Sequence, residues 1–372
     1  MGTGRRFNSW KSGLTTISLL LLSRVAVVAL GAAGSVFGIR TPNPGEGLWH
    51  HDIPIIGLFA RWDSAMYLDI ALIGYWKNAL YAFRPLFPFI LNAFHHYFGN
   101  PPREAAIIAG FAWNLACLVP LGLLFHRLTA LVYDEEAAQR STMLLAVHPS
   151  TLFLTATYPQ TTYLLLVVAA FYLLETDRVI PAGLLGLLAG LTRTEGAFLF
   201  IPFLFKYIYH KRDPRYLFAA AASATAFPAF MLLSHLNGDG FFTPLLVQMG
   251  WDTTTVWNIL RVYEPGQLAF YSLGFITMSL SAASVFGFFM GDKSTQDRET
   301  PYFTWALALL TVFVVTGEIR SWSRLTMTIP PVIWGLSQRS EENPRMYRVL
   351  LVAFTMLMSF STVSYVNWYQ VL

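Results

Sequence analysis

Long apolar runs recur along the whole of this chain, and they constrain its fold more than any other feature. Residues 14–38, 217–236 and 347–367 each form such a run. At ~1.5 Å per helical residue, about 20 residues cross the ~30 Å hydrocarbon core of a bilayer. Only 12% of the 372 residues are charged, about half the share in an ordinary soluble domain. The sequence therefore predicts an all-α polytopic membrane protein without a separate soluble domain.

The hydropathy pattern predicts about 11 transmembrane helices. We place them at residues 14–38, 105–125, 141–157, 160–174, 180–192, 196–210, 217–236, 267–290, 302–317, 322–337 and 347–367. The first follows a basic start, MGTGRRFNSWKSG, but it is longer than the ~7–15-residue apolar region of a signal peptide. We therefore interpret it as a retained first membrane helix.

The distribution of basic residues predicts the orientation of the chain. With a cytoplasmic amino terminus, fifteen of the 25 Lys and Arg residues fall in inner segments, nine in outer segments, and Arg24 lies within a span. The densest basic cluster, KYIYHKRDPR, falls inside, as the positive-inside rule requires. The net charge of +4 is spread over many loops, so it does not indicate nucleic-acid binding. The single cysteine, Cys117, lies in an apolar run and is expected to be a small buried hydrophobe.

This orientation places residues 39–104 on the outer side, as the longest segment without a span. A helical-looking run from Leu58 to Ile73 lies within it, and the prolines of FRPLFP end any helix that began earlier. We expect a membrane-surface helix followed by a turn back to the bilayer.

The stretch FARWDSAMYLDIALIGYW, residues 59–76, sets an arginine and two carboxylates among apolar residues. On a helix, Asp63 shares one face with Tyr67 and Gly74, whereas Asp69 points elsewhere and is expected to be solvated. Charged groups near a bilayer usually mark a polar cavity, because placing them against lipid is costly. From spacing alone, Asp63 is either a carboxylate facing such a cavity or a simple helix cap.

Two further segments place arginines at the outer ends of spans. In TRTEG, residues 192–196, Arg193 either pairs with Glu195 or presents its planar donors to a phosphate. In GEIRSWSR, Arg320 and Arg324 stand four residues apart on one helical face, where they either snorkel to the interface or bind an anion.

Other polar residues give weaker signals. Tyr158, in TATYPQTTY at an outer helix junction, either lines the same cavity or belongs to the aromatic belt of the interface. His50, His51 and Asp52 have no further ligands at a recognisable spacing, so we do not expect a metal site. No glycine-rich phosphate loop occurs, which argues against a nucleotide-driven pump.

Several of these segments together resemble a known family. RWDSAMYLDIALIGY, AFRPLFP, LLAVHPSTLFLTATYPQTTYLLL and GLLAGLTRTEG are similar, in order and spacing, to the motifs of the PIG-V family of GPI mannosyltransferases and its prokaryotic homologues. The resemblance covers residues 59–205, and its first motif is the most specific. The chain departs from the family pattern at Arg84, at Pro159-Gln160 and at Glu195. These departures leave the acceptor and the sugar open.

The resemblance implies a GT-C glycosyltransferase fold with a long first outer loop that carries surface helices. We therefore expect one integral membrane domain over residues 1–372. Within it, residues 39–104 would form the outer loop with the catalytic motif, residues 105–236 the GT-C core helices, and residues 237–372 the C-terminal helices with an outer loop.

The resemblance also implies Asp63 as the catalytic carboxylate and Arg193 as a ligand of the donor phosphate. We expect the reaction to be an inverting transfer with Asp63 as base. The donor phosphate or substrate would be bound by a set of outer side chains: Arg61, Arg84, Arg193, Arg320, Arg324, Tyr67, Tyr158 and Glu195.

The expected donor is a polyprenyl or dolichyl phosphate mannose, and the expected acceptor is a lipid-linked glycan or glycolipid. The lipid bilayer is the other expected partner, the resemblance allows for a small membrane partner subunit, and no cofactor is expected to be required. The site would face the non-cytoplasmic side, of the plasma membrane in a prokaryote or of the endoplasmic reticulum in a eukaryote.

Two other classes of function fit the same composition. A secondary transporter or flippase for a lipid-linked anion would also use outer arginines, but such proteins usually carry sequence repeats, and we find none. A noncatalytic membrane scaffold gives no reason for Asp63 and the arginines to gather on one side. The sequence therefore favours an enzyme.

Overall fold

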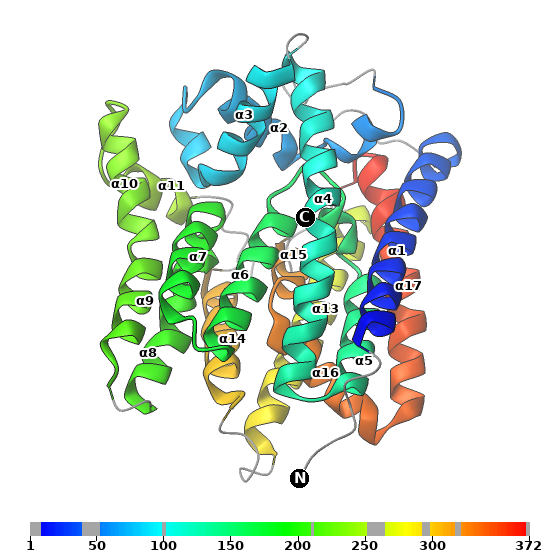
Figure 1. The fold of residues 1–372 in the computed structure, drawn as a ribbon. Coiled ribbons are helices and arrows are strands. Elements are labelled where there is room, and N and C mark those ends of the chain that lie inside the picture. Colours follow the sequence, from blue (N-terminus) through cyan, green and yellow to red (C-terminus); the bar gives the residue numbers. More distant parts are fainter. Residues whose placement is uncertain are drawn as a thin grey trace.

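The computed structural model of this chain describes residues 9–38, 53–98, 102–209, 212–250, 265–291, 298–316 and 321–369. Their regular secondary structure is helical (Figure 1), as the hydropathy pattern predicts. The α-helices are α1 (Ser9–Phe37), α2 (Asp63–Ile73), α3 (Leu86–Phe98), α4 (Pro102–Val132), α5 (Glu135–Ala146), α6 (Gln160–Glu175), α7 (Val179–Thr192), α8 (Phe200–Tyr209), α9 (Pro214–Ala224), α10 (Ala226–Leu236), α11 (Thr243–Gly250), α13 (Pro265–Met290), α14 (Thr300–Thr316), α15 (Trp322–Met327), α16 (Pro330–Glu342) and α17 (Pro344–Val366). Short 3-10 helices lie between some of them: η1 (Ile56–Phe59), η2 (Asn78–Ala82), η3 (Thr151–Leu154) and η4 (Thr194–Leu199).

Several helical segments are suited to crossing a bilayer. By length and composition, five of the described segments qualify: Thr15–Phe37, Arg103–Val132, Pro214–Leu236, Tyr271–Met290 and Pro344–Val366. Three apolar helices are shorter: Gln160–Glu175, Val179–Thr192 and Thr300–Thr316. The protein is therefore a multi-pass membrane protein, as predicted, but these segments do not confirm the predicted total of about 11 spans.

Two of the predicted spans are interrupted near a proline. The segment 141–157 is wrong as a continuous helix, because α5 ends before Pro149 and a turn leads into η3. The segment 322–337 is divided between α15 and α16 at Ile329, which precedes Pro330. Proline lacks a backbone N–H and disfavours helical backbone in the residue before it. Apolar length alone therefore overestimates how far these helices continue.

The segment between α1 and α4 forms a cap on one end of the helical bundle. In Figure 1, α2 and α3 lie across the upper end, whereas α1 begins near the opposite end. A small hydrophobic core of its own stabilises this cap: Tyr67 and Leu68 of α2 cluster with Phe87 of α3 and Ile107 of α4. The expected surface helix at Leu58–Ile73 is therefore η1 followed by α2.

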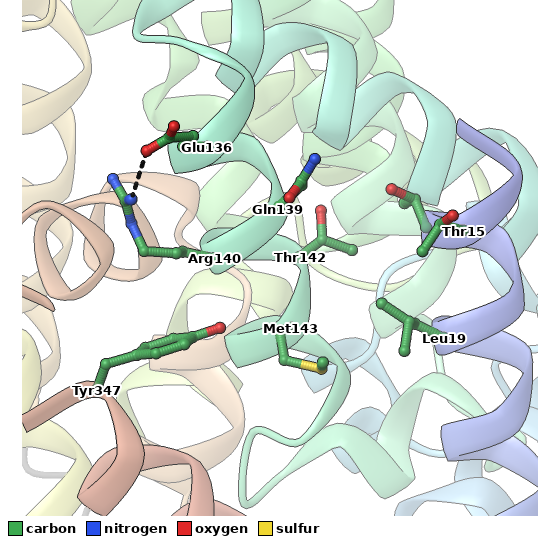
Figure 2. A pocket seen from close by; sticks show the side chains of 9 residues that line it. Thr15, Leu19, Glu136, Gln139, Arg140, Thr142, Met143 and Tyr347 are labelled. Atoms are coloured by element: carbon green, nitrogen blue, oxygen red, sulfur yellow. Dashed lines mark ion pairs between the residues drawn. The ribbon is translucent and has the colours of Figure 1, made fainter. Parts of the chain in front are cut away.

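The end of the bundle away from this cap carries a separate set of ion pairs. A cavity of about 570 Å³ lies there between α1, α5 and α17 (Figure 2), and Arg140 on its wall pairs with Glu341 at 2.5 Å. At the end of α6, Glu175 accepts hydrogen bonds from Lys206 at 3.1 Å and Arg298 at 2.7 Å. These three cations are among those that the sequence assigns to the inner side.

Candidate active site

Asp63 is the first residue of α2, and the backbone just before it is strained. Trp62 has φ 58° and ψ −124°, in a region that bulky residues rarely adopt. Such a conformation persists only where the surroundings hold it in place. No side chain caps the start of α2, and the Asp63 carboxylate instead reaches α15. The helix-cap alternative is therefore not what the structure shows.

Two tyrosine hydroxyls hold the Arg61–Asp63 segment in place. The Tyr158 hydroxyl accepts a hydrogen bond from the Asp63 N–H at 3.1 Å and donates to the Arg61 carbonyl at 3.2 Å. From α17, the Tyr365 hydroxyl accepts from the Arg61 N–H at 3.1 Å and donates to the Arg61 carbonyl at 3.0 Å. Asn114 of α4 in turn donates to the Tyr158 carbonyl at 3.0 Å. Contacts from three separate parts of the chain thus fix the main chain at Asp63.

The Asp63 carboxylate forms an ion pair with Arg324. Arg324 Nη1 donates to Asp63 Oδ2 at 2.7 Å, and Arg324 Nη2 donates to the Ser321 hydroxyl at 3.1 Å. The Arg324 side chain is 9% exposed and that of Asp63 is 21% exposed. Asp63 is therefore both oriented by Arg324 and reachable from outside.

A second ion pair, whose side chains are 12% and 13% exposed, joins Arg193 and Glu195 after the end of α7. Arg193 Nη2 donates to Glu195 Oε1 at 2.8 Å, so the ion-pair alternative for these residues is confirmed. Burial raises the pKa of Glu195, but Arg193 has the opposite and dominant effect, so the pKa lies below its usual value. Gly196 allows this geometry, because a Cβ there would lie 2.2 Å from the carbonyl carbon of Ala189. Only glycine lets η4 fold back this closely onto α7.

Tyr67 lies between these two ion pairs. Burial raises the pKa of its hydroxyl, and four charged groups also act on it: Arg193, Asp63, Arg324 and Glu195. Its ring packs edge-on against the ring of Tyr158, with 6.3 Å between the centroids. The face that Asp63 and Tyr67 were predicted to share is therefore directed at one polar site.

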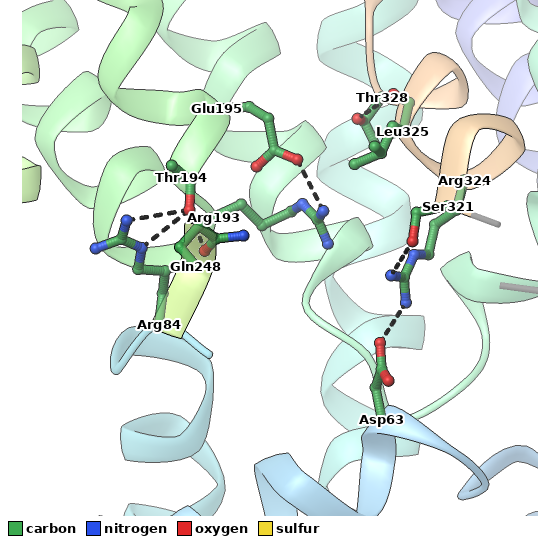
Figure 3. A network of polar contacts seen from close by, with 10 residues as sticks. All are labelled: Asp63, Arg84, Arg193, Thr194, Glu195, Gln248, Ser321, Arg324, Leu325 and Thr328. Carbon is green, nitrogen blue, oxygen red and sulfur yellow. Dashed lines mark hydrogen bonds and ion pairs between the residues drawn. The ribbon is translucent and has the colours of Figure 1, made fainter. Parts of the chain in front are cut away.

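Arg84 extends the site on the side of η2. Its Nε and Nη2 both donate to the Thr194 hydroxyl, at 3.2 and 3.0 Å, and its guanidinium lies over the rings of Phe227 and Phe230. Burial lowers the pKa of Arg84 to about 10. Figure 3 shows the resulting row of polar groups, with Arg84 at one end, Arg193 between, and Asp63 at the other end.

Three other residues were assigned a role or position from the sequence, and each needs a separate description. The Arg61 guanidinium lies over the ring of Trp368, 4.5 Å from its centre. Arg320 lies outside the described residues. The expectation that Asp69 is solvated is wrong, because it is 8% exposed and burial raises its pKa. Neighbouring segments cover α2 on more than one face, so the helical periodicity of its sequence does not show that Asp69 is buried.

The described residues offer no metal site. No three His, Cys, Asp or Glu side chains among them come together in a way that could hold a metal ion. His50, His51 and Asp52 lie outside the described part of the chain. Cys117 is buried and free, as its apolar surroundings predict.

Four participants were missed at the sequence level. Thr194, Gln248 and Ser321 make hydrogen bonds to or beside the arginines, and Tyr365 holds the main chain of Arg61. Thr194 lies within TRTEG and Ser321 within GEIRSWSR, so attention to hydroxyls beside those arginines would have found them. No sequence signal marks Tyr365 or Gln248.

The comparison with known families agrees with this geometry. Residues 52–244 match the family described as Mannosyltransferase (PIG-V), which is just over half of the 372 residues. The chain belongs to the PIG-V mannosyltransferase family. The match includes Asp63, Arg84 and Arg193, whereas Arg324 lies beyond it. PIG-V membership and the all-helical membrane architecture agree with the expected GT-C fold class.

Comparison with curated proteins gives no significant match. Among solved structures, the Archaeoglobus fulgidus oligosaccharyltransferase in complex with Zn and sulfate is similar at 15% identity and a TM-score of 0.45, over 91% of this chain and 53% of that one. The oligosaccharyltransferase AglB from the same organism, in complex with an inhibitory peptide and a dolichol-phosphate, gives 16% identity and a TM-score of 0.44, over 93% and 56%. The PIG-V chain thus spans about half the length of the solved proteins it matches.

Proposed function

We propose that this protein is a membrane glycosyltransferase that transfers mannose from a polyprenyl phosphate donor to a hydroxyl of a lipid-linked glycan. The observation that carries the proposal is Asp63, a partly exposed carboxylate that two tyrosines and one arginine hold in a fixed position. Membership of the PIG-V family supports the reaction class and the sugar. The multi-pass architecture suits substrates whose lipid chains stay in the bilayer.

In the proposed reaction, Asp63 acts as a general base. Its Oδ2 is bound by Arg324, so Oδ1 would accept the hydrogen of the acceptor hydroxyl. The acceptor oxygen forms a bond to C1 of the sugar while the bond from C1 to the phosphate oxygen breaks. The proton passes to Asp63, the electron pair leaves with the phosphate, and the configuration at C1 inverts.

The guanidinium groups would stabilise the charge that develops on the leaving phosphate. Arg84 and Arg193 are held in place before any substrate arrives, by Thr194 and Glu195. Fixed donors of this kind need no rearrangement during the reaction, and they are usually the largest single contribution to catalysis. Arg84 is buried and the Arg193 side chain is only 12% exposed, and electrostatic interactions are stronger in such surroundings than in water.

We propose that the site faces the non-cytoplasmic side of the membrane. The predicted inner cations Arg140, Lys206 and Arg298 form ion pairs away from the cap that carries Asp63, which supports this orientation. The membrane itself would be the plasma membrane in a prokaryote or the endoplasmic reticulum in a eukaryote.

The replacement Asp63→Asn tests the proposal. The purified protein would be incubated with labelled polyprenyl phosphate mannose and lipid acceptors, and with the matching glucose donor. We expect the variant to lose transfer by about 100-fold or more, because a positioned base typically contributes this much. Thermal unfolding of the variant serves as the folding control. Turnover of Asp63→Asn at the wild-type rate would refute the assignment, and transfer of glucose in place of mannose would correct the donor.

A further inference from the structure

The three arginines of the site differ in how their charge is balanced. Arg324 pairs with Asp63 at 2.7 Å, and Arg193 pairs with Glu195 at 2.8 Å. Among the described residues, Arg84 has the neutral Thr194 hydroxyl as its one hydrogen-bond partner, and the rings that it lies over are uncharged. Within the described site, three guanidinium groups therefore face two carboxylates, and Arg84 is the one without a carboxylate bound to it.

Arg84 also has donor capacity to spare. The side chain is 3% exposed, and its Nη1 is buried without a hydrogen-bond partner in the described part of the chain. Arg193 and Arg324 have this at Nε alone, whereas in Arg84 it is a terminal nitrogen with two hydrogens. A buried charged donor that lacks a partner is costly, so its presence is typical of a site that is completed by a ligand. Because Nε and Nη2 are held by Thr194, Nη1 can bind an anion without releasing the contacts that orient the guanidinium.

We propose that Arg84, oriented by Thr194, is the phosphate subsite of this protein, and that its ligand is the monoanionic phosphodiester of a lipid-linked sugar. This inference rests on the proposed function and deepens it. One negative charge brought to Arg84 makes the cluster neutral, and a phosphodiester carries one such charge. A planar guanidinium with two adjacent donors is suited to phosphate oxygens.

The position of Arg84 also fits an inverting displacement. In such a reaction the base and the leaving group lie on opposite faces of the sugar. Arg324 is bound directly to Asp63, so it lies on the side of the base. Figure 3 places Arg84 at the opposite end of the row from Asp63, so the base and the proposed phosphate subsite are at separate ends of the site.

A neighbouring apolar surface favours a lipid phosphate over a free one. Gln248 of α11 accepts a hydrogen bond from the Thr194 hydroxyl at 3.4 Å. On the same short helix, Leu246 and Met249 are 65% and 66% exposed, and they are three residues apart, on one face. A phosphate at Arg84 would therefore lie close to an exposed apolar face along which an attached polyprenyl chain can run.

Binding measurements on the full-length protein in detergent test this proposal without requiring transfer. The probes are undecaprenyl phosphate mannose, which is a phosphodiester, added without acceptor, and inorganic phosphate; the readout is the ligand-dependent rise in the thermal unfolding temperature. We expect undecaprenyl phosphate mannose to stabilise the wild type and Arg84→Gln to weaken that binding by about tenfold or more, since a charge-assisted bond is lost. Lys77→Gln, which removes a cation from the same outer segment, should bind like the wild type.

The remaining outcomes distinguish a lipid-linked phosphate from a free phosphate. They also separate the test of this subsite from the test of the proposed function. Equal protection by inorganic phosphate would show that the ligand is a free anion and would overturn the lipid assignment. Wild-type binding by Arg84→Gln would overturn the subsite. The variant Arg84→Lys, which keeps the charge, checks that a loss of binding is not a folding defect.

Asp63→Asn should bind the lipid phosphate like the wild type. If Arg84→Gln loses binding while the wild type transfers no sugar, the subsite stands and the proposed function fails.

Discussion

At the scale of single residues, the position of Asp63 depends on a hydroxyl that is distant in sequence. Tyr158 accepts from the Asp63 N–H and donates to the Arg61 carbonyl, and the intervening Trp62 holds a strained conformation. We expect Tyr158→Phe to lower the free energy of unfolding by about 1–3 kcal/mol, because the Asp63 N–H loses its acceptor and the Arg61 carbonyl keeps only the donor from Tyr365. Turnover should fall further than stability, since a shift of Asp63 by about 1 Å can cost 100-fold. Parallel measurements of transfer rate and thermal unfolding check this.

The control for Tyr158→Phe is Tyr209→Phe, which removes an exposed hydroxyl at the end of α8. It should leave both quantities unchanged. If Tyr158→Phe transferred sugar at the wild-type rate, the hydroxyl would have no role in positioning Asp63.

The Arg193–Glu195 pair makes the free energy of unfolding depend on pH, with a contribution that is lost in acid. Burial works against ionised Glu195, yet Arg193 dominates and the folded-state pKa lies below the ordinary value of 4.5. The unfolded chain therefore binds the proton more readily, so the pair stabilises the fold fully above about pH 4.5 and the contribution disappears as the pH falls through the lowered pKa. Glu195→Gln should lose about 3 kcal/mol at neutral pH, because it leaves Arg193 buried and unpaired.

Unfolding curves of the wild type and Glu195→Gln across pH 3–7 test this directly. The difference between the two proteins should shrink toward acid. A constant difference over the whole range would mean that the carboxylate of Glu195 does not contribute through its charge.

Sequence reasoning found most residues of the site but not the pairing of Asp63 with Arg324. The i, i+4 spacing of Asp63 and Tyr67 was sufficient to place both on one face. The contact between Asp63 and Arg324 joins residues 261 positions apart, and no local pattern encodes such a contact. The pairing of Arg193 with Glu195 was one of two alternatives that the sequence left open, and the structure shows the ion pair.

At the scale of helices, an arginine within the membrane explains how an interrupted segment is stabilised. Arg24 of α1 is 2% exposed and donates to the carbonyl of Ala146 at the end of α5, at 3.1 Å. It also donates to the carbonyl and, at 2.7 Å, to the hydroxyl of Thr151 in η3. These acceptors are free because the chain around Pro149 leaves the helix, and inside a membrane they need a partner. Arg24 therefore closes the gap between α5 and η3.

We expect Arg24→Gln to destabilise the protein by about 3 kcal/mol or more, because several buried acceptors lose their donor together. Arg127→Gln, which removes an exposed arginine from α4, is the matched control and should be neutral. The measurement is the thermal unfolding temperature of each variant in the same detergent. Equal unfolding temperatures would show that other groups or water satisfy these carbonyls.

The same interrupted segments mark the limit of sequence prediction at this scale. Apolar length correctly predicted α1, α4 and α17 as long membrane helices. It failed where proline breaks an apolar run, at Pro149 and Pro330, although the prolines themselves were visible. In a membrane such breaks occur only where other side chains satisfy the freed backbone groups, and these side chains belong to distant helices.

At the scale of the whole molecule, the charges separate along the axis of the bundle. The cap of α2 and α3 lies at one end of the bundle, whereas α5 and α16, whose Arg140 and Glu341 form an ion pair, reach toward the other end (Figure 1). Under the orientation proposed above from the positive-inside rule, the second end faces the cytoplasm. A polyprenyl-linked donor would then have to present its sugar on the non-cytoplasmic surface, and an earlier step would have to bring the sugar across the membrane.

This orientation can be measured by cysteine labelling, for which the chain is well suited because its single cysteine is buried. In a Cys117→Ser background, Trp76→Cys reports on the cap, where Trp76 is 56% exposed, and Glu342→Cys reports on the exposed end of α16. A membrane-impermeant maleimide added to intact cells should modify Trp76→Cys and not Glu342→Cys, and both should react after permeabilisation. The distribution of basic residues, fifteen inside and nine outside, favours the proposed orientation. Labelling of Glu342→Cys alone would overturn it and would place Asp63 on the cytoplasmic side. The donor would then be used on the same side on which soluble sugar nucleotides are available, and no transfer of the sugar across the membrane would be needed.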